Sequence, residues 1–451
     1  MVIQKALGEG PMMKAVVAPE ELEEYFDRLW PILRSITGEG VRRSHDILSE
    51  IIPLERIEIP SGTECFDWVV PKEWVVREAY LIDPGGKRIL DIAENNLHLV
   101  NYSVPFQGVI SRRDLDAHLY SRPDLPEAIP YVTSYYEPRW GFCLSHIQRD
   151  ALPEGDYQVV IDTDLIEGSL TIGEAVLPGE TESEVLISTY TCHPSMANNE
   201  LSGPLVSAFL YRELKSMEKR RFTYRFLFLP ETIGSVAYLQ LRGDELKKNL
   251  LAGYVVTCVG DSGPFNYKKT RHGNHLTDRA ALHVLEVDER VDAYKVHDFF
   301  PDGGSDERQY CSPGFNLPVG SLMRTMYRDY AEYHTSMDDK NFIDFNAMSD
   351  TVGVYAKIME TLEQSEVWDR VDSRCEPQLS KHGLYPSLGT IDREQISAMM
   401  WVLNYSDGTR EIAEIARLSG LSIDQISNAA QQCAKAGLIV PLGHLGREGK
   451  S

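Results

Sequence analysis

The sequence lacks a hydrophobic run long enough to cross a membrane, although 43 % of its 451 residues are hydrophobic. Its longest apolar runs, such as Phe226–Leu229, have the length of a strand, whereas a membrane helix needs about 20 apolar residues. The N-terminal residues also lack the continuous apolar segment of a secretory signal peptide. These absences disfavour a membrane or secreted protein and predict a cytoplasmic one.

Paired cysteines are also missing. The seven cysteines are scattered, their number is odd, and no two form a CxxC pair. This pattern argues against a disulfide framework and against a cysteine-rich zinc ribbon. Reduced thiols in a cytoplasmic protein fit it better.

Basic residues are few. Lysine and arginine total 45 against 68 aspartates and glutamates, which gives a formal net charge of −23. Binding to nucleic acids or to anionic membranes relies on a surplus of positive charge. The composition therefore disfavours both kinds of partner and is typical of a soluble globular protein.

Changes in residue pattern divide the chain into four stretches, with no internal repeat or low-complexity linker. Apolar residues recur at helical spacing after Pro19, behind an acidic first turn. Residues 61–150 are rich in aromatic residues, proline and turn signals such as Asp83-Pro84-Gly85-Gly86, which indicates a small β-rich unit. The expected units are residues 15–60, 61–150, 151–375 and 385–451, and the last is helical.

The third stretch alternates strands and helices. Short apolar runs at 185–189, 224–229 and 254–259 read as buried strands, and apolar residues at 204–214 and 236–241 have helical spacing. This alternation predicts an α/β fold with helices on the faces of a sheet. Ligands of such sheets bind beyond the carboxyl ends of the strands.

Polar side chains follow several of these predicted strands. His193 and Glu200 come after the first strand, Glu231 after the second and Asp261 after the third, and His334 lies further along. Histidine and carboxylate ligands suit a divalent metal such as zinc. Taken singly, each cluster could equally cap a helix, but independent loops have no reason to share this placement. Their convergence favours a metal site at one edge of the sheet.

These residues resemble the zinc aminopeptidase superfamily, whose members carry a co-catalytic metal pair and which includes the single-zinc glutaminyl cyclases. The matching positions are His193, the Leu201-Ser202-Gly203 turn, Glu231, Gly234-Ser235 and Tyr333-His334-Thr335.

The whole chain resembles, more closely, a bacterial family of aminopeptidase-like proteins associated with polysaccharide-biosynthesis loci. That resemblance rests on Phe66-Asp67-Trp68, Asn101-Tyr102-Ser103-Val104-Pro105, Trp140-Gly141-Phe142-Cys143 and Cys192-His193-Pro194-Ser195. It implies a peptidase-like mixed sheet sandwiched by helices, built from residues 15–60 and 151–375. It also implies an inserted small β-rich domain at 61–150 and a winged-helix domain at 385–451.

The chain departs from the peptidase pattern at three metal-binding positions. Asn199 stands where the pattern has a bridging aspartate, Thr232 where it has a second glutamate, and Cys258 where it has another aspartate. Amide and hydroxyl groups bind zinc poorly beside carboxylates. One zinc ion is therefore expected rather than two. The predicted ligands are His193, His334 and Glu200, with Asp261 as a possible fourth.

The resemblance implies a zinc-dependent hydrolase that cleaves a peptide or other amide bond. Glu231 would act as the general base for a metal-activated water. Arg271, Arg308 and Arg139 are candidates for binding a substrate carboxylate, because arginine offers a bidentate fork, although each is also an ordinary salt-bridge residue. The expected partner is a small peptide-like or amide substrate, and a homo-oligomer is compatible with the sequence.

Two other functions stay open. Asn199 and Thr232 are compatible with a degenerate peptidase fold that binds a ligand or partner without turnover. The winged-helix resemblance suggests a DNA-binding regulator, but from Pro386 onward the chain has six basic and seven acidic residues. A DNA-binding domain needs basic side chains that neutralise phosphates, and this stretch has no surplus of them. The C-terminal domain is therefore expected to bind protein rather than nucleic acid.

Overall fold

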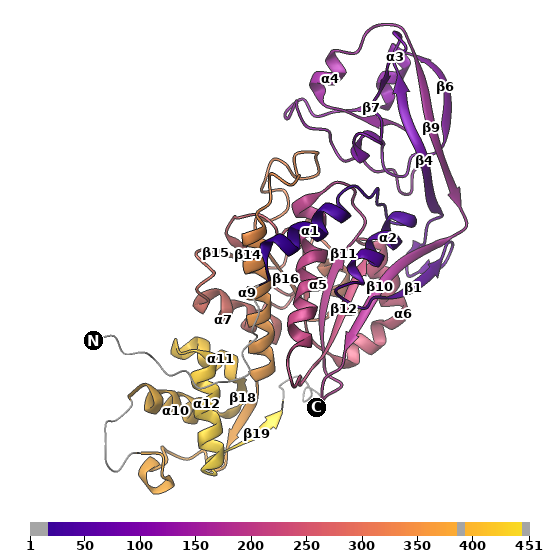
Figure 1. The fold of residues 1–451 in the computed structure, drawn as a ribbon. Coiled ribbons are helices and arrows are strands. Elements are labelled where there is room, and N and C mark those ends of the chain that lie inside the picture. The colour runs from indigo at the N-terminus through magenta and orange to yellow at the C-terminus, as the bar shows by residue number, and fades with distance from the viewer. Residues whose placement is uncertain (1–16, 386–392, 444–451) are drawn as a thin grey trace.

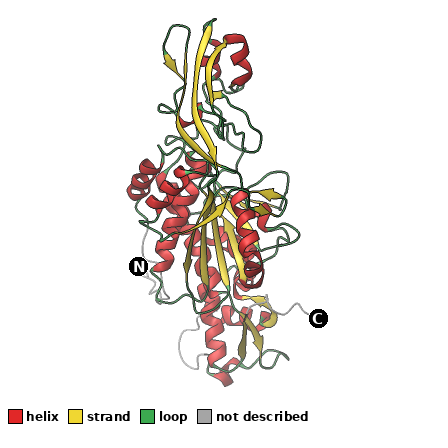
Figure 2. Cartoon of the chain, turned by 90° about the vertical axis from the view of Figure 1, so that its right-hand side faces the viewer, coloured by secondary structure: helices red, strands yellow, loops and turns green. Residues whose placement is uncertain are grey.

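The computed structural model describes residues 17–385 and 393–443, which form three parts that follow one another along the molecule (Figure 1). A β-rich part lies at one end, an α/β part in the middle and a small, mainly helical part at the other end (Figure 2). Residues 15–16 of the first expected unit, and 386–392 and 444–451 of the last, lie outside the described residues.

The middle part is built on an eight-stranded mixed sheet. In order across the sheet the strands are β1 (Glu55–Pro60), β10 (Ser169–Leu177), β12 (Thr223–Leu229), β11 (Glu184–Tyr190), β13 (Leu250–Val255), β16 (Val319–Met323), β14 (Phe265–Lys268) and β15 (Tyr294–His297). The central strands β12, β11, β13 and β16 are parallel to one another. Their carboxyl ends therefore meet at one edge of the sheet.

Strand β11 separates two hydrophobic cores, because successive residues of a strand point to opposite faces of the sheet. Val185 and Ile187 belong to one core, and Leu186 and Tyr190 to the other. The first core is covered by α1 (Pro19–Leu29), α2 (Glu39–Leu48), α5 (Ser202–Lys215), α7 (Leu276–Val287) and α9 (Phe345–Gln364); the second by α6 (Ile233–Asn249) and α8 (Glu307–Tyr310).

The segment after β11 packs closely against the sheet at the point where α5 begins. A Cβ atom on Gly203 would collide with the Thr189 hydroxyl and the Val256 carbonyl, so only glycine fits there. The close approach fixes the preceding π-helical turn, η3 (Ala197–Leu201), over the carboxyl edge of the central strands. Such turns are rare and frequently mark functional sites.

The β-rich part is an insertion between β1 and β10. Its four-stranded antiparallel sheet has the order β5 (Arg88–Ile89), β4 (Glu73–Ile82), β9 (Asp156–Ile166) and β6 (Phe106–Ser111). Strand β9 runs almost directly into β10, which joins the insertion to the central sheet. The remaining elements are the strand pairs β2 (Glu64–Cys65) with β3 (Trp68–Val69) and β7 (Leu119–Tyr120) with β8 (Phe142–Cys143), and the short helices η1 (Asn96–His98), α3 (Arg112–Leu115), η2 (Asp116–His118) and α4 (His146–Asp150).

The described residues of the C-terminal part combine three α-helices and one short 3-10 helix with a three-stranded sheet. The sheet has the order β18 (Asp407–Glu411), β17 (Val367–Arg370) and β19 (Ile439–Gly443), and the helices are η4 (Leu379–His382), α10 (Arg393–Tyr405), α11 (Ile412–Ser419) and α12 (Ile423–Lys435). Glu411 pairs with Arg279 of α7, and Asp424 accepts a hydrogen bond of 2.9 Å from Gln364 of α9. These contacts fix the C-terminal part to the middle part.

The α/β class predicted from the sequence is confirmed, but two predicted elements differ. The strand expected at 254–259 is instead β13, which ends at Val255, and residues 256–261 form a buried loop. The last unit, expected to be helical, also contains the strand β18, and its helix α11 begins after that strand, at Ile412. No helix in residues 17–385 or 393–443 is long and apolar enough to span a membrane.

Candidate active site

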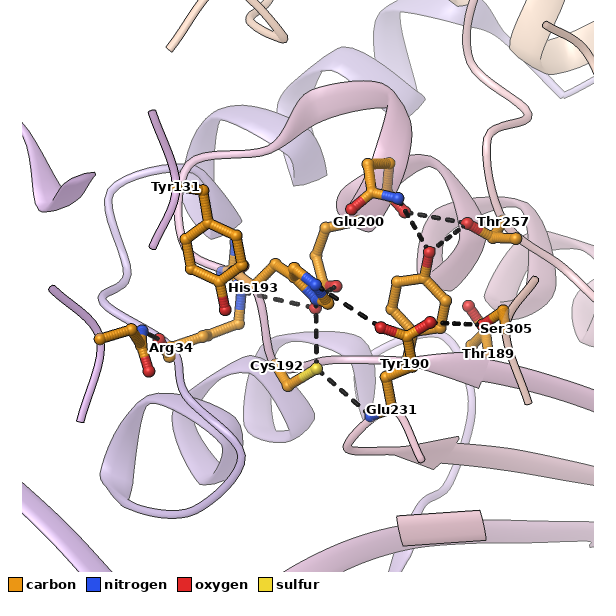
Figure 3. A network of polar contacts seen from close by, with 12 residues as sticks. Arg34, Tyr131, Thr189, Tyr190, Cys192, His193, Glu200, Glu231, Thr257 and Ser305 are labelled. Atoms are coloured by element: carbon orange, nitrogen blue, oxygen red, sulfur yellow. Dashed lines mark hydrogen bonds and ion pairs between the residues drawn. The ribbon is translucent and has the colours of Figure 1, made fainter. Parts of the chain in front are cut away.

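His193 and Glu200 come together just beyond the carboxyl end of β11. His193 follows the strand by three residues, and Glu200 is carried back toward it by the π-helical turn η3. His193 Nδ1 lies 2.9 Å from Glu200 Oε2, and both side chains are buried (Figure 3). Burial makes the charged form of His193 unfavourable, but Glu200 and the nearby Glu231 outweigh this effect and raise its pKa.

A buried arginine lies on the far side of this pair. Arg34 Nε donates a hydrogen bond of 3.0 Å to the main-chain oxygen of His193 and lies 4.0 Å from Glu200 Oε1. Glu200 Oε1 is buried and accepts no hydrogen bond. Burying a carboxylate oxygen without a hydrogen bond destabilises the folded state unless a positive group or an ion lies near that oxygen.

Glu231 approaches His193 from the neighbouring strand. It follows β12 by two residues, and its Oε2 lies 3.6 Å from His193 Nε2 (Figure 3). Its other oxygen accepts a hydrogen bond of 2.9 Å from the Ser305 hydroxyl, and its main-chain N–H donates to Cys192 Sγ at 3.3 Å. Removal from solvent raises the pKa of Glu231, while His193 and the Ser305 hydrogen bond lower it.

His334 completes the group from the far end of the chain. Its ring centroid lies 5.3 Å from that of His193, and its ring stacks on Tyr333 at 4.0 Å. Its main-chain oxygen accepts a hydrogen bond of 2.8 Å from the N–H of Tyr131, which belongs to the insertion. Burial and the proximity of His193 lower the pKa of His334, which keeps the ring neutral, as metal binding requires.

Asp338 joins the His334 segment to the turn that carries Glu200. Its two side-chain oxygens accept hydrogen bonds from the N–H groups of Asn198 and Asn199, at 2.6 and 3.0 Å. Burial raises the pKa of Asp338 to about 7, although these hydrogen bonds oppose the increase. The aspartate therefore fixes the distance between two segments that are far apart in the sequence.

A second buried aspartate, Asp306, supports the turn after Glu231. Its Oδ1 accepts hydrogen bonds of 2.7 Å from the Thr232 N–H and from the Ser235 hydroxyl, and its Oδ2 has no partner. Burial and the charge of Glu231 raise the pKa of Asp306 to about 8. Together with its neighbour Ser305, it holds Glu231 in place.

Backbone strain is concentrated around the site. Four residues that are not glycine adopt left-handed conformations there: His334 (φ 55°), Thr232 (φ 65°), Ser195 (φ 47°) and Cys258 (φ 51°). Each such conformation costs of order 1 kcal/mol or more and persists only where its surroundings enforce it. Strain of this kind clusters at functional sites.

The side chains present fit a zinc ion. Ligand atoms of Cys192, His193 and Glu200 lie within 4.8 Å of one another, and in the described part of the chain they form the one such group. Glu200 Oε1 accepts no hydrogen bond but lies 4.0 Å from Arg34 Nε. His334 is neutral and lies outside this three-residue group, with its ring centroid 5.3 Å from that of His193. Burial and the nearby carboxylates hold the pKa of the Cys192 thiol well above its ordinary value, which makes it a weaker ligand than the histidines.

Asp261 lies in a different network from His193. Its Oδ1 accepts hydrogen bonds from the Thr325 hydroxyl and the Gly263 N–H, at 2.6 and 2.7 Å. Its Oδ2 accepts from the Thr325 N–H and from the Asn198 amide, at 3.1 and 2.9 Å. Both oxygens are therefore engaged in holding the loop after β13.

The three predicted arginines lie apart from the group. Arg271 is exposed and donates to the side chain of Asn316, and Arg139 lies over the ring of Tyr120. Arg308 donates to the main-chain oxygen of Ser305, and its charge lowers the pKa of Glu231. Of the three, only Arg308 acts on the site, and it does so through electrostatics.

The positions that depart from the peptidase pattern have partners of their own. The Asn199 amide donates a hydrogen bond of 3.0 Å to the Tyr190 hydroxyl, and the Asn199 oxygen is buried without a partner. Cys258 Sγ lies 3.8 Å from the Tyr330 hydroxyl. Asn199 and Cys258 therefore offer neutral, hydrogen-bonding groups at positions where the peptidase pattern has carboxylates.

A cavity of about 360 Å³ opens onto His193, Glu231 and His334. Much of its wall comes from the insertion, including Trp68 and Tyr131. The sequence predicted neither this contribution nor the roles of Ser305, Asp306 and Asp338. The polar segments at 303–308 and 332–338 were the only signal for these residues.

Comparison with known proteins agrees with the fold. Residues 23–365 match a family model described as a domain of unknown function (DUF4910), and residues 366–441 match a winged helix-turn-helix model. A Clostridium acetobutylicum protein is 44 % identical over 421 residues, which cover 93 % of this chain and 96 % of the relative. It is provisionally named a polysaccharide biosynthesis protein with an aminopeptidase-like domain.

Solved structures give the same picture. A crystal structure of a C. acetobutylicum protein, provisionally named a peptidase, has a TM-score of 0.86 and 42 % identity over 94 % of this chain and 96 % of its own. A zinc aminopeptidase from Bacillus subtilis has a TM-score of 0.58 and 13 % identity over 78 % of this chain and 96 % of its own. A peptidase M28 precursor from Shewanella amazonensis has a TM-score of 0.53 and 12 % identity over 77 % of this chain and 93 % of its own. The last two likenesses establish an aminopeptidase-like fold.

Proposed function

This chain belongs to the DUF4910 family, joined to a winged helix-turn-helix domain, and from that premise we propose that it is a zinc-dependent hydrolase of amide bonds. One observation carries the proposal. His193 lies 2.9 Å from Glu200 and 3.6 Å from Glu231, and its ring is 5.3 Å from that of His334. Two histidines and two carboxylates thus converge at the carboxyl edge of a peptidase-like sheet.

His193, His334 and Glu200 would hold one zinc ion, since Glu200 contacts His193 and the His334 ring lies close by. Asp261 is left out of this set because both of its oxygens are engaged in the loop after β13. One ion is favoured over two because Asn199, Thr232 and Cys258 are neutral. When bound, zinc polarises an amide carbonyl and makes water acidic enough to lose a proton near neutral pH.

Glu231 would take the proton from the attacking water and deliver it to the amide nitrogen as the carbon–nitrogen bond breaks. A raised pKa suits both steps, because a general base is more effective when its pKa lies closer to the working pH. Ser305 fixes one oxygen of Glu231 and leaves the other directed toward His193.

The name of the C. acetobutylicum relative supports a substrate from polysaccharide biosynthesis. The competing reading is a degenerate peptidase fold that binds a ligand without turnover. Asn199 and Thr232 support that interpretation only if both metal positions are lost. The contact between Glu200 and His193, with the His334 ring close by, supports the retention of one position.

The test is hydrolysis of a panel of aminoacyl and N-acyl amides by the zinc-supplemented full chain, with Glu231→Gln measured alongside. We expect Glu231→Gln to lower kcat at least about 100-fold, because it removes the base. The variant should retain bound zinc, since Glu231 is not one of the proposed ligands. Equal rates for the variant and the wild type would remove Glu231 as the base.

A further inference from the structure

The shape and chemistry of the cavity over His193 restrict the substrate. The cavity measures about 360 Å³, which is near the lower end of the range for small-molecule sites. Its wall is formed by residues from the insertion and from the loops of the central sheet. They are Ile36, Trp68, Tyr131, Thr133, Tyr135, Tyr136, Cys192, His193, Glu231, Thr232, Ile233 and His334.

Aromatic rings from the insertion dominate this wall. Trp68 and Tyr136 are 39 % and 49 % exposed, which is high for such large side chains. They pack edge to face with their centroids 5.7 Å apart, and the Tyr136 hydroxyl donates to the main-chain oxygen of Val69 at 3.3 Å. The rings are thus held in place by the β2–β3 hairpin while part of each remains open to solvent.

Hydroxyl groups lie deeper in the same wall. The hydroxyls of Tyr131 and Tyr135 are 2.6 Å apart, and Thr133 is also part of the cavity lining. The ring of Tyr131 lies 5.0 Å from that of His193. The wall therefore presents flat apolar faces together with hydroxyl donors and acceptors, next to the proposed catalytic group.

The wall offers no free partner for a charged substrate group. Among the described residues that line it there is no lysine or arginine, and the raised pKa of His193 reflects carboxylates, Glu200 and Glu231, that already face it. Glu231 is the one carboxylate in the lining, and it already faces His193 and Ser305. A free α-ammonium group beside the amide, as in an aminopeptidase substrate, would lack a dedicated anion.

We propose that the substrate is an N-acylated amino sugar whose N-acyl amide is hydrolysed at Glu231. One face of a pyranose ring is apolar and stacks on aromatic rings, here Trp68 and Tyr136, and its hydroxyls suit Thr133 and the Tyr131–Tyr135 pair. Such a group is uncharged beside the amide and is small enough for the cavity. Water adds its oxygen to the acyl carbon, the carbon–nitrogen bond breaks, and the products are a carboxylic acid and the free amino sugar.

This inference rests on the proposed hydrolase function and is tested on the zinc-supplemented full chain. The two probes are methyl N-acetyl-β-glucosaminide and leucine amide. We expect kcat/KM to be at least about 10-fold higher for the sugar amide, the ratio that one favourable aromatic contact provides. A higher kcat/KM for leucine amide would overturn the substrate class and leave the hydrolase function standing.

Variants locate the sugar contact. Trp68→Ala should raise KM for the sugar amide about 10-fold with kcat little changed, and Trp68→Phe should recover most of the loss because it keeps a ring. Phe66→Ala is the matched control. Phe66 is exposed on the same hairpin but packs on Phe315 and does not line the cavity. An equal KM increase in Phe66→Ala would mean that the hairpin, and not the Trp68 ring, is responsible.

A binding measurement separates the two proposals. If no amide is hydrolysed, the hydrolase function fails, and calorimetric titration with methyl N-acetyl-β-glucosaminide then decides the substrate class. Binding that weakens in Trp68→Ala but not in Phe66→Ala supports a sugar subsite. The absence of binding to wild type overturns it.

Discussion

The Ser305 hydroxyl donates a hydrogen bond of 2.9 Å to Glu231 Oε1, although the two residues lie on different loops. The adjacent Asp306 accepts a hydrogen bond from the N–H of Thr232, the residue after Glu231. The segment that carries Ser305 and Asp306 therefore contacts both the side chain of the proposed base and the backbone that follows it.

Replacing Ser305 by alanine should shift the pH dependence of the rate. The Ser305 hydrogen bond lowers the pKa of Glu231, so its loss raises that pKa. The acid limb of the rate–pH profile should move to higher pH, and kcat at neutral pH should fall about 10-fold with KM nearly unchanged. Steady-state kinetics between about pH 5 and 9 measures both effects. Ser262→Ala, at an exposed position after β13, is the control and should leave the profile in place.

His45 should make the folded protein sensitive to acid. Burial lowers its pKa to about 3, whereas an unfolded chain binds the proton near the ordinary value of about 6.5. The unfolded state therefore gains a proton that the folded state does not, and stability falls as the pH drops below about 6.5. The contribution amounts to about 1.4 kcal/mol per pH unit in that range.

His45→Gln removes this titration while leaving a polar group that can still reach Thr191. Between pH 7.5 and 5.0, wild type should lose about 2 kcal/mol more unfolding free energy than the variant, measured by urea denaturation. The raised pKa of Asp338 makes the folded state more stable as the pH falls, which opposes the effect of His45. Asp338 is present in both proteins, so its contribution cancels in the comparison. Equal losses would contradict the assignment of the acid sensitivity to His45.

The ion pair between Arg279 and Glu411 should stabilise the contact between the middle and C-terminal parts. Glu411 is 2 % exposed, and burial raises its pKa while Arg279 lowers it. Arg279→Ala leaves a buried carboxylate unpaired and should cost about 3 kcal/mol, measured by urea denaturation. The double variant Arg279→Met/Glu411→Met should recover most of this loss. Arg374→Ala, which breaks an exposed pair with Asp372, should cost less than about 1 kcal/mol.

The winged helix-turn-helix domain should not bind DNA. In helix-turn-helix proteins the first residues of the second helix contact the base edges. Here Asp424 lies at the start of α12, accepts a hydrogen bond from Gln364 and is 3.8 Å from Lys357, so this end of the helix contacts α9. Fluorescence anisotropy with random-sequence duplex DNA at low salt should give no binding at about 10 μM protein. An affinity that falls steeply with salt would restore the DNA-binding regulator.

The sequence predicts the elements that have regular patterns. The apolar run at 185–189 lies within β11 and the run at 224–229 lies within β12, because hydrophobicity at these positions reflects strands buried on both faces. The run at 254–259 was misleading for a physical reason. Val256, Cys258 and Val259 are buried, but in a loop that leaves the sheet after Val255.

The proximity of His193, Glu200, Glu231 and His334 was predictable because they come from segments that follow strands at the carboxyl edge of the sheet. Their supporting residues were not. Ser305 meets Glu231, and Tyr131 meets His334, only through the packing of segments far apart in the chain, and no local pattern encodes those contacts. The same limit applies to Asp261, which follows β13 as expected but whose oxygens are taken up by Thr325, Gly263 and Asn198.

The zinc content of the purified full chain, measured by elemental analysis after incubation with zinc and removal of excess metal, tests the central claim most directly. We predict about one zinc per chain, lost in His193→Ala, His334→Ala and Glu200→Gln and retained in Asp261→Asn. Circular dichroism of each variant establishes that it is folded. A folded wild-type protein without zinc, or zinc that persists in both histidine variants, would contradict the account.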